Sequence, residues 1–184
     1  MKFGLIDRIV DLEPGQRVRA VKAVSLAEEY LGDHFPSFPV LPGVFMLEAM
    51  VEAAGWLVRV SHEFRVSVIL LASAKNVTYK SFVKPGNLLE LDIECRALSE
   101  TESEFKGSGT CAGAEMVKAR FSLRHGYVDA FATRRAARPA TESARSRSSA
   151  SATLPGSTSK SLEPSKTDEK LINHARARYA LLRG

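Results

Sequence analysis

The sequence predicts an α+β domain in which a curved antiparallel β-sheet wraps around one central buried helix. Residues 43–60 are apolar on nearly every side of a helical projection, as in a helix that is buried all round. Segments before and after this run alternate apolar and polar residues with a period of two, which is the pattern of half-buried strands. A sheet must have its apolar face covered, and the sequence offers one long helix to cover it.

Two short strands are expected before the helix. Apolar residues alternate between Phe3 and Ile9, and the Glu-Pro-Gly sequence at 13–15 then indicates a turn. Residues 18–24 form the second expected strand, so the chain opens with a hairpin. Residues 31–42 contain three prolines, which remove backbone donors and fix φ, so we expect a stiff, irregular loop there.

The predicted helix runs from Gly43 to Val60, and Pro42 directly before it suits a helix start. Strand-like alternation resumes after the helix, with a Lys-Pro-Gly-Asn turn at 84–87. The strands expected after the helix are residues 66–79, 89–95, 105–112 and 117–123. The strand at 105–112 is the least regular, because it contains two glycines.

The formal net charge of +5 and the pI of about 9.4 come from the C-terminal part of the chain. Residues 1–130 hold 15 Lys and Arg against 17 Asp and Glu, whereas residues 131–184 hold 11 against 4. The folded part is therefore not basic, which gives little support to a nucleic-acid-binding function.

The two cysteines lie in no Cys-x-x-Cys pair and near no spaced histidines, so we expect no metal site and no cofactor. The first residues lack the basic and apolar regions of a secretory signal. No apolar run approaches the roughly 20 residues that a membrane span needs. We therefore expect a cytoplasmic protein with reduced thiols.

Three parts are expected along the chain. Residues 1–128 form the folded domain. Residues 129–166, rich in Ser, Ala and Arg, form a disordered linker, because they cannot bury enough apolar surface to offset their ordering entropy. Residues 167–184 form a short basic amphipathic helix, with Thr167 as its N-cap and two acidic residues in its first turn.

The candidate site lies where the stiff loop meets the helix. His34 stands beside the prolines, so its position is fixed at little entropic cost. Glu48 is a carboxylate in an otherwise apolar helix, and burial would penalise its charged form and raise its pKa. A histidine can accept a proton and a protonated carboxyl can donate one, as an elimination reaction requires. Gly43, at the helix start, would present a free N–H that polarises a carbonyl group.

Taken alone, these residues favour a plainer interpretation. A lone histidine before a proline-rich loop is usually a surface or hydrogen-bonding residue. Glu48 and Glu52 are four residues apart, and together with Arg59 they could form an ordinary polar stripe on one helix face.

The loop and helix start resemble the 3-hydroxyacyl-[acyl-carrier-protein] dehydratases of fatty-acid synthesis, the hot-dog-fold family called FabZ. Residues 34–43 read HFPSFPVLPG and are followed by Glu-Ala-Met at 48–50. The family pattern is His-Phe-Pro-Gly-x-Pro-x-x-Pro-Gly followed by Glu-Ala-Met at the same spacing. The hairpin at 7–15 and the turn at 82–87 are also similar, so the resemblance covers residues 3–125.

The resemblance implies a hot-dog fold and dehydration of a 3-hydroxyacyl thioester, carried by acyl carrier protein, to a trans-2-enoyl thioester. In this interpretation His34 takes the α-proton, Glu48 protonates the departing hydroxyl, and the N–H of Gly43 binds the thioester carbonyl. The family forms homodimers in which the histidine and the glutamate of one site come from different subunits. Whether the dimers assemble into a trimer of dimers stays open. The candidate lining residues of an apolar acyl tunnel are Phe38, Val40, Phe45 and Met46.

Two departures from the family pattern bear on activity. Ser37 replaces the motif glycine, and Glu52 replaces a glutamine that is common after Glu-Ala-Met-x. A second carboxylate one turn from Glu48 would raise the pKa of one of the pair. Two alternatives therefore stay open, namely an acyl-thioester hydrolase of the same fold and a noncatalytic acyl-carrier-binding paralogue.

The tail beyond about residue 129 has no counterpart in short family members. We interpret it as a solvated extension, with an arm that docks the acidic carrier protein or binds polyanions as the alternative.

Overall fold

The secondary structure is taken from a computed structural model, which describes residues 4–128 and 164–184. In chain order its elements are β1 (Arg8–Glu13), β2 (Arg17–Ala23), the 3₁₀ helix η1 (Glu29–Leu31), α1 (Gly43–Ser61), β3 (Val68–Tyr79), β4 (Leu88–Leu98), β5 (Glu102–Cys111), β6 (Ala114–Gly126) and α3 (Lys166–Arg183).

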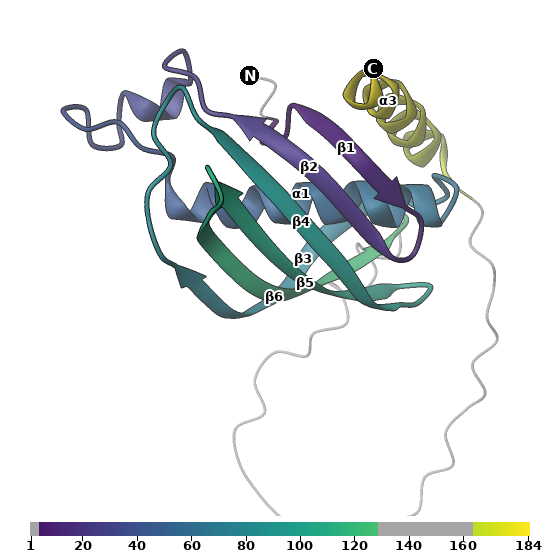
Figure 1. Ribbon diagram of the computed structural model, residues 1–184. Helices are drawn as coiled ribbons and strands as arrows, with labels where there is room; N and C mark the ends of the chain where they lie inside the picture. Colours follow the sequence, from purple (N-terminus) through teal and green to yellow (C-terminus); the bar gives the residue numbers. More distant parts are fainter. Residues whose placement is uncertain (1–3, 129–163) are drawn as a thin grey trace, which may run out of the picture.

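The strands form one six-stranded antiparallel sheet in the order β1-β2-β4-β5-β6-β3. The sheet curves around α1, and the irregular loop that precedes α1 lies at one end of the helix (Figure 1). The predicted fold class is thus confirmed. Among the elements that the structure describes, no helix has the length and apolar character needed to cross a membrane.

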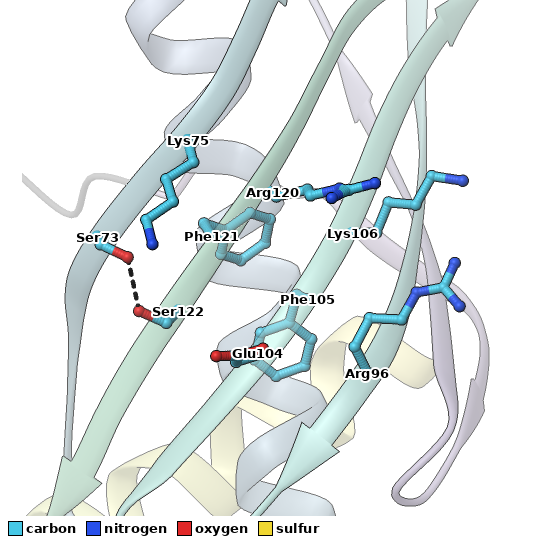
Figure 2. Close-up of a pocket in the computed structure, with 9 residues that line it drawn as sticks. All are labelled: Ser73, Lys75, Arg96, Glu104, Phe105, Lys106, Arg120, Phe121 and Ser122. Atoms are coloured by element: carbon cyan, nitrogen blue, oxygen red, sulfur yellow. Dashed lines mark hydrogen bonds between the residues drawn. The ribbon is translucent and has the colours of Figure 1, made fainter.

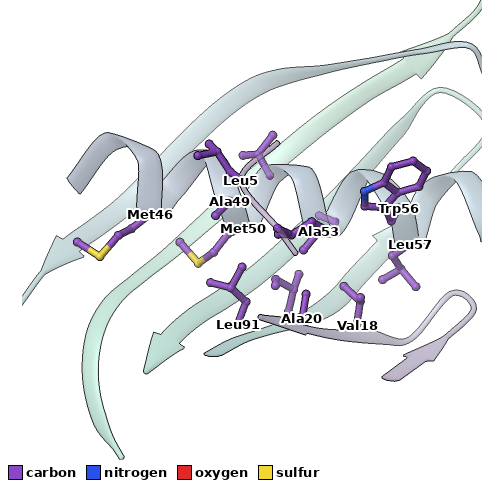
Figure 3. Close-up of a cluster of buried hydrophobic side chains, with 14 of the residues drawn as sticks. Leu5, Val18, Ala20, Met46, Ala49, Met50, Ala53, Trp56, Leu57 and Leu91 are labelled. Atoms are coloured by element: carbon purple, nitrogen blue, oxygen red, sulfur yellow. The ribbon is translucent and has the colours of Figure 1, made fainter. Parts of the chain in front are cut away.

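The core lies between α1 and the concave face of the sheet. Met50, Ala53 and Leu57 of the helix are fully buried, and Figure 3 shows them facing side chains of β2 and β4. Two glycines of β5, Gly107 and Gly109, lie where a side chain would collide with neighbouring elements. A Cβ at Gly107 would lie 2.9 Å from Sδ of Met50, and one at Gly109 would lie 2.8 Å from Cγ1 of Val117. The two glycines allow close packing of the helix and neighbouring strands, and β5 is fully paired on both sides.

Several strand boundaries differ from those predicted. β4 ends three residues later than predicted, and β6 begins three residues earlier and ends three residues later. Two other differences involve a specific polar contact. The first strand begins at Arg8 and not near Phe3, because the N–H of Leu5 donates to Oε2 of Glu52 (2.7 Å) and not to a neighbouring strand. The third strand after the helix begins at Glu102, three residues earlier than expected. Its Ser103 lies on the inward face of β5, two residues before Phe105, and bonds Nε2 of His125 (2.8 Å), so a polar residue extends the buried face where the apolar pattern has ended.

The C-terminal helix α3 lies beside β1 (Figure 1). Its N-cap is Ser165, not Thr167 as predicted, and the side chains of Ser165 and Asp168 form a capping box. Buried residues of α3 include Ile172, Ala175 and Leu182. The predicted linker at 129–166 lies outside the described residues, apart from its last three.

Candidate active site

His34 lies in the loop between η1 and α1 and is half-buried. Its N–H donates to the carbonyl of Tyr30 (3.2 Å), and its ring centroid lies 4.5 Å from that of Phe35. Phe35 has a φ of 53°, an uncommon conformation for a residue with a side chain, so the chain turns sharply directly after the imidazole. Ser37 is not among the residues with positive φ, so replacement of the motif glycine introduces no backbone strain there.

The start of α1 fits the predicted carbonyl-binding role. The helix begins at Gly43 with Pro42 as its N-cap. Among the described residues no hydrogen-bond partner is recorded for the N–H of Gly43, which is the usual state of the first donors of a helix. A Cβ on Gly43 would lie 3.2 Å from the ring of Tyr79. A side chain at this position would therefore crowd the space in front of the first N–H of the helix.

Glu48 occupies the second turn of α1 on a side that the sheet does not cover. The expectation that it is buried is wrong for the single chain, because its neighbour Val44 is 64% exposed and Glu48 itself is exposed. The expected direction of its pKa is confirmed. Partial desolvation raises the pKa of Glu48, and the charge of Glu52 one turn further raises it again.

Glu48 lines a pocket of about 290 Å³ between α1 and α3. Glu52, which lines the same pocket, accepts hydrogen bonds from two sides. Oε1 lies 2.5 Å from Nη2 of Arg178, and Oε2 accepts the N–H of Leu5 at 2.7 Å. The remaining lining residues are Trp56, Arg59, Ser67, Leu171, His174 and Ala175.

The predicted substrate-binding residues do not gather in this pocket. Phe38 is 48% exposed, with its ring centroid 6.5 Å from that of Phe82 and 4.7 Å from Nζ of Lys84. Val40 is fully buried in the core, and Phe45 is half-buried with its ring 4.9 Å from Tyr30.

His34 also lies outside the pocket that Glu48 lines. A further hollow of about 640 Å³ lies on the face of the sheet that is turned away from α1 (Figure 2). Cationic side chains from neighbouring strands line it, including Lys75 and Arg120, but no histidine does. The single chain therefore presents the predicted base and acid at separate places.

Sequence reasoning missed the role of α3 at this site. Leu171, His174, Ala175 and Arg178 of α3 all line the Glu48 pocket, although they follow it by more than 120 residues. The sequence offers two signals: a second carboxylate, Glu52, with no nearby cation in the sequence, and a basic amphipathic helix at the end of the chain. Neither signal indicates that Glu52 and this helix are in contact. Within residues 4–128 and 164–184 no group of three or more metal-ligating side chains is present.

Comparisons with known proteins cover the region that contains these residues. A model of the FabA-like domain family matches residues 1–119. The 3-hydroxyacyl-[acyl-carrier-protein] dehydratase FabZ of Symbiobacterium thermophilum is 39% identical over 128 residues, which cover 70% of this chain and 89% of that relative. FabZ of Bacillus subtilis is 35% identical over 111 residues, covering 60% of this chain and 79% of the relative.

A solved structure has the same fold. The dehydratase heterocomplex ApeI:P from Xenorhabdus doucetiae superposes with a TM-score of 0.60 at 19% identity, over 70% of this chain and 87% of that chain. The helix α3 lies outside the part of the chain that the family model matches.

Proposed function

Because this chain belongs to the FabZ family of 3-hydroxyacyl-[acyl-carrier-protein] dehydratases, within the FabA-like domain family, we propose that it dehydrates 3-hydroxyacyl thioesters of acyl carrier protein in fatty-acid biosynthesis, with His34 and Glu48 as catalytic residues. The observation that carries the assignment of roles is the state of Glu48. Its raised pKa means that the carboxyl keeps its proton to a higher pH than an ordinary glutamate does, and it stands one turn into the helix that the His34 loop leads into.

The proposed reaction is an elimination. The imidazole of His34 takes the proton from the α-carbon, and the electrons of that C–H bond form the double bond between the α- and β-carbons. The bond between the β-carbon and the hydroxyl oxygen breaks, and Glu48 donates its proton so that the hydroxyl leaves as water. The N–H of Gly43 binds the thioester oxygen, where negative charge develops as the α-proton leaves. Transfer of a proton from imidazolium to carboxylate, through solvent, restores the enzyme.

The protein acts, in this proposal, as a homodimer that joins His34 of one subunit to Glu48 of the other. The separate placement of the two residues in the single chain supports this. So does the exposed apolar surface along the free edge of β3 and beside the start of α1, because such surfaces mark interfaces. The opposite edge strand, β1, lies against α3. The exposed apolar residues of this surface are Phe35, Phe38, Val44, Leu70, Leu71, Tyr79 and Phe82.

The acyl chain of the substrate would lie against the apolar residues around the start of α1. Phe38 and Phe45 have exposed or partly exposed rings there, and Val40 is buried in the same loop as Phe38. We place the enzyme in the cytoplasm, where Cys95 and Cys111 would stay reduced.

The test is turnover of a 3-hydroxyacyl thioester of acyl carrier protein, followed by the absorbance of the conjugated enoyl product. We expect His34→Ala and Glu48→Gln each to reduce the rate by at least about 100-fold, since each removes a proton-transfer group. Glu63→Gln, at an exposed position just past α1, is the matched control and should keep the wild-type rate. Wild-type rates in both His34→Ala and Glu48→Gln would overturn the assignment. Release of free thiol from a saturated acyl thioester, without enoyl formation, would identify a hydrolase instead.

A further inference from the structure

Helix α3 brings a cation to the carboxylates of the candidate site. The guanidinium of Arg178 pairs with Glu52 at 2.5 Å and lies over the ring of Trp56, 5.7 Å from its centroid. A Cβ on Gly4 would lie 2.5 Å from Nη2 of Arg178, so the guanidinium occupies space that any other residue at position 4 would fill. Arg178 is therefore paired and stacked against α1, and the absence of a side chain at Gly4 leaves room for its guanidinium.

The helix itself is fixed in place by buried contacts. Asp168, in its first turn, is fully buried and accepts hydrogen bonds from the hydroxyl of Ser67 and the N–H of Val128 (3.0 Å). Tyr179 packs its ring against Trp56 and Phe64, with centroids 6.1 Å and 5.5 Å apart. These contacts hold α3 against the core, so that Arg178 reaches Glu52 from a defined position.

The charges that face Glu52 come from α1 and from α3. Glu48 and Arg59 lie on its own helix, and His174 and Arg178 lie on α3. The N-terminal segment contributes the N–H of Leu5, which is uncharged. Within the described residues, Arg178 is the cation in direct contact with Glu52.

We propose that Arg178 is a positioning residue for the dehydration, because its ion pair with Glu52 offsets the negative charge beside Glu48 and so limits how tightly Glu48 holds the proton that it transfers. This inference deepens the proposed function and rests on it. The ion pair balances the second carboxylate that Glu52 places one turn from Glu48. It gives α3, which the family model does not match, a specific task at the site.

Two substitutions should move the titration of Glu48 in opposite directions. Arg178→Met removes a cation and leaves two carboxyls side by side, so the last proton of the pair is held more tightly and the apparent pKa of Glu48 rises. Glu52→Gln removes the anion and leaves Arg178 uncompensated, so the pKa falls. Each shift should be about one pH unit, the low end for neighbouring charges, because Glu48 is largely exposed. The double variant removes both charges and should titrate close to the wild type.

The measurement is ¹³C NMR of the full-length chain labelled at the glutamate side-chain carboxyl, with the Glu48 signal assigned by its loss in Glu48→Gln. Arg178→Lys keeps the charge and should shift little. Arg176→Met, on the exposed side of α3 with its guanidinium 5.9 Å from the Phe64 ring, is the matched control. The pH dependence of kcat/KM is recorded in parallel for every variant, and its Glu48-dependent limb should follow the NMR shifts.

The outcomes separate the two proposals. Opposite shifts in the single variants and their cancellation in the double variant support the role of Arg178. An unchanged Glu48 titration in Arg178→Met, with an active wild-type enzyme, overturns it and leaves the dehydratase assignment intact. Absence of turnover in the wild type at every pH overturns the dehydratase assignment, whichever way Glu48 titrates. A merely structural effect of Arg178 would lower all rates together and leave the pKa of Glu48 in place.

Discussion

The docking of α3 depends on one buried carboxylate, that of Asp168. Burial by itself would raise the pKa of this group, but hydrogen bonds from Ser67, Val128 and Ser165 outweigh it and lower the pKa from 3.8 to about 2. Because the pKa is lower in the folded protein, the ionised form stabilises the docked helix. The difference corresponds to about 2 kcal/mol at neutral pH. This contribution is fully present above about pH 4 and disappears as the pH falls through about 2.

Asp168→Ala should therefore release α3 without unfolding the sheet. At neutral pH we expect amide hydrogen exchange in residues 166–183 to accelerate about 30-fold, the equivalent of about 2 kcal/mol of local opening. Exchange in β4 should stay at the wild-type rate and serves as the internal reference. Glu169→Ala is the matched control, since Glu169 is an exposed acidic residue in the same first turn of α3. It should accelerate exchange by less than about fivefold.

Two results would refute this reasoning. Wild-type protection of α3 in Asp168→Ala would mean that apolar contacts alone fix the helix. Wild-type α3 that keeps its full protection on acidification from pH 5 to pH 2 would mean that the carboxylate contributes nothing to docking. The two tests are independent, because the second leaves every side chain in place.

The remaining predictions concern packing and assembly. Gly109→Ala should lower the free energy of unfolding in urea by about 1–3 kcal/mol, because its Cβ would meet Val117 at 2.8 Å, and an unchanged midpoint would contradict the packing. Gly55→Ala should raise the free energy of unfolding by about 0.5–1 kcal/mol, because alanine has the higher helix propensity and the atoms nearest to its Cβ lie 3.6 Å away or further. A loss of stability would contradict the open space at this position. Inactive His34→Ala and Glu48→Gln subunits, mixed and allowed to exchange, should recover about a quarter of the wild-type activity, since half of the dimers are mixed and each has one intact site. No recovery after demonstrated exchange would exclude a site shared between subunits.

The fold could be predicted because its signals are local. The apolar run of α1 and the alternation in β4 and β6 repeat with the period of the element that they form, so neighbouring residues are enough to identify them. At two of the mispredicted boundaries a distant polar partner replaces the local rule. Ser103 extends the buried face of β5 with His125 as its hydrogen-bond partner, and Leu5 is kept out of the first strand by Glu52.

The sequence by itself determined the loop and helix that carry His34, Gly43 and Glu48, because a histidine beside three prolines and a carboxylate on the second helical turn are fixed by spacing along the chain. Only the tertiary structure decided the charge around Glu48. The contact between Glu52 and Arg178 joins residues 126 positions apart, and that between Ser67 and Asp168 joins residues 101 positions apart. Such contacts leave no period in the sequence, because each depends on how two separately predictable elements pack and on which of their side chains then meet.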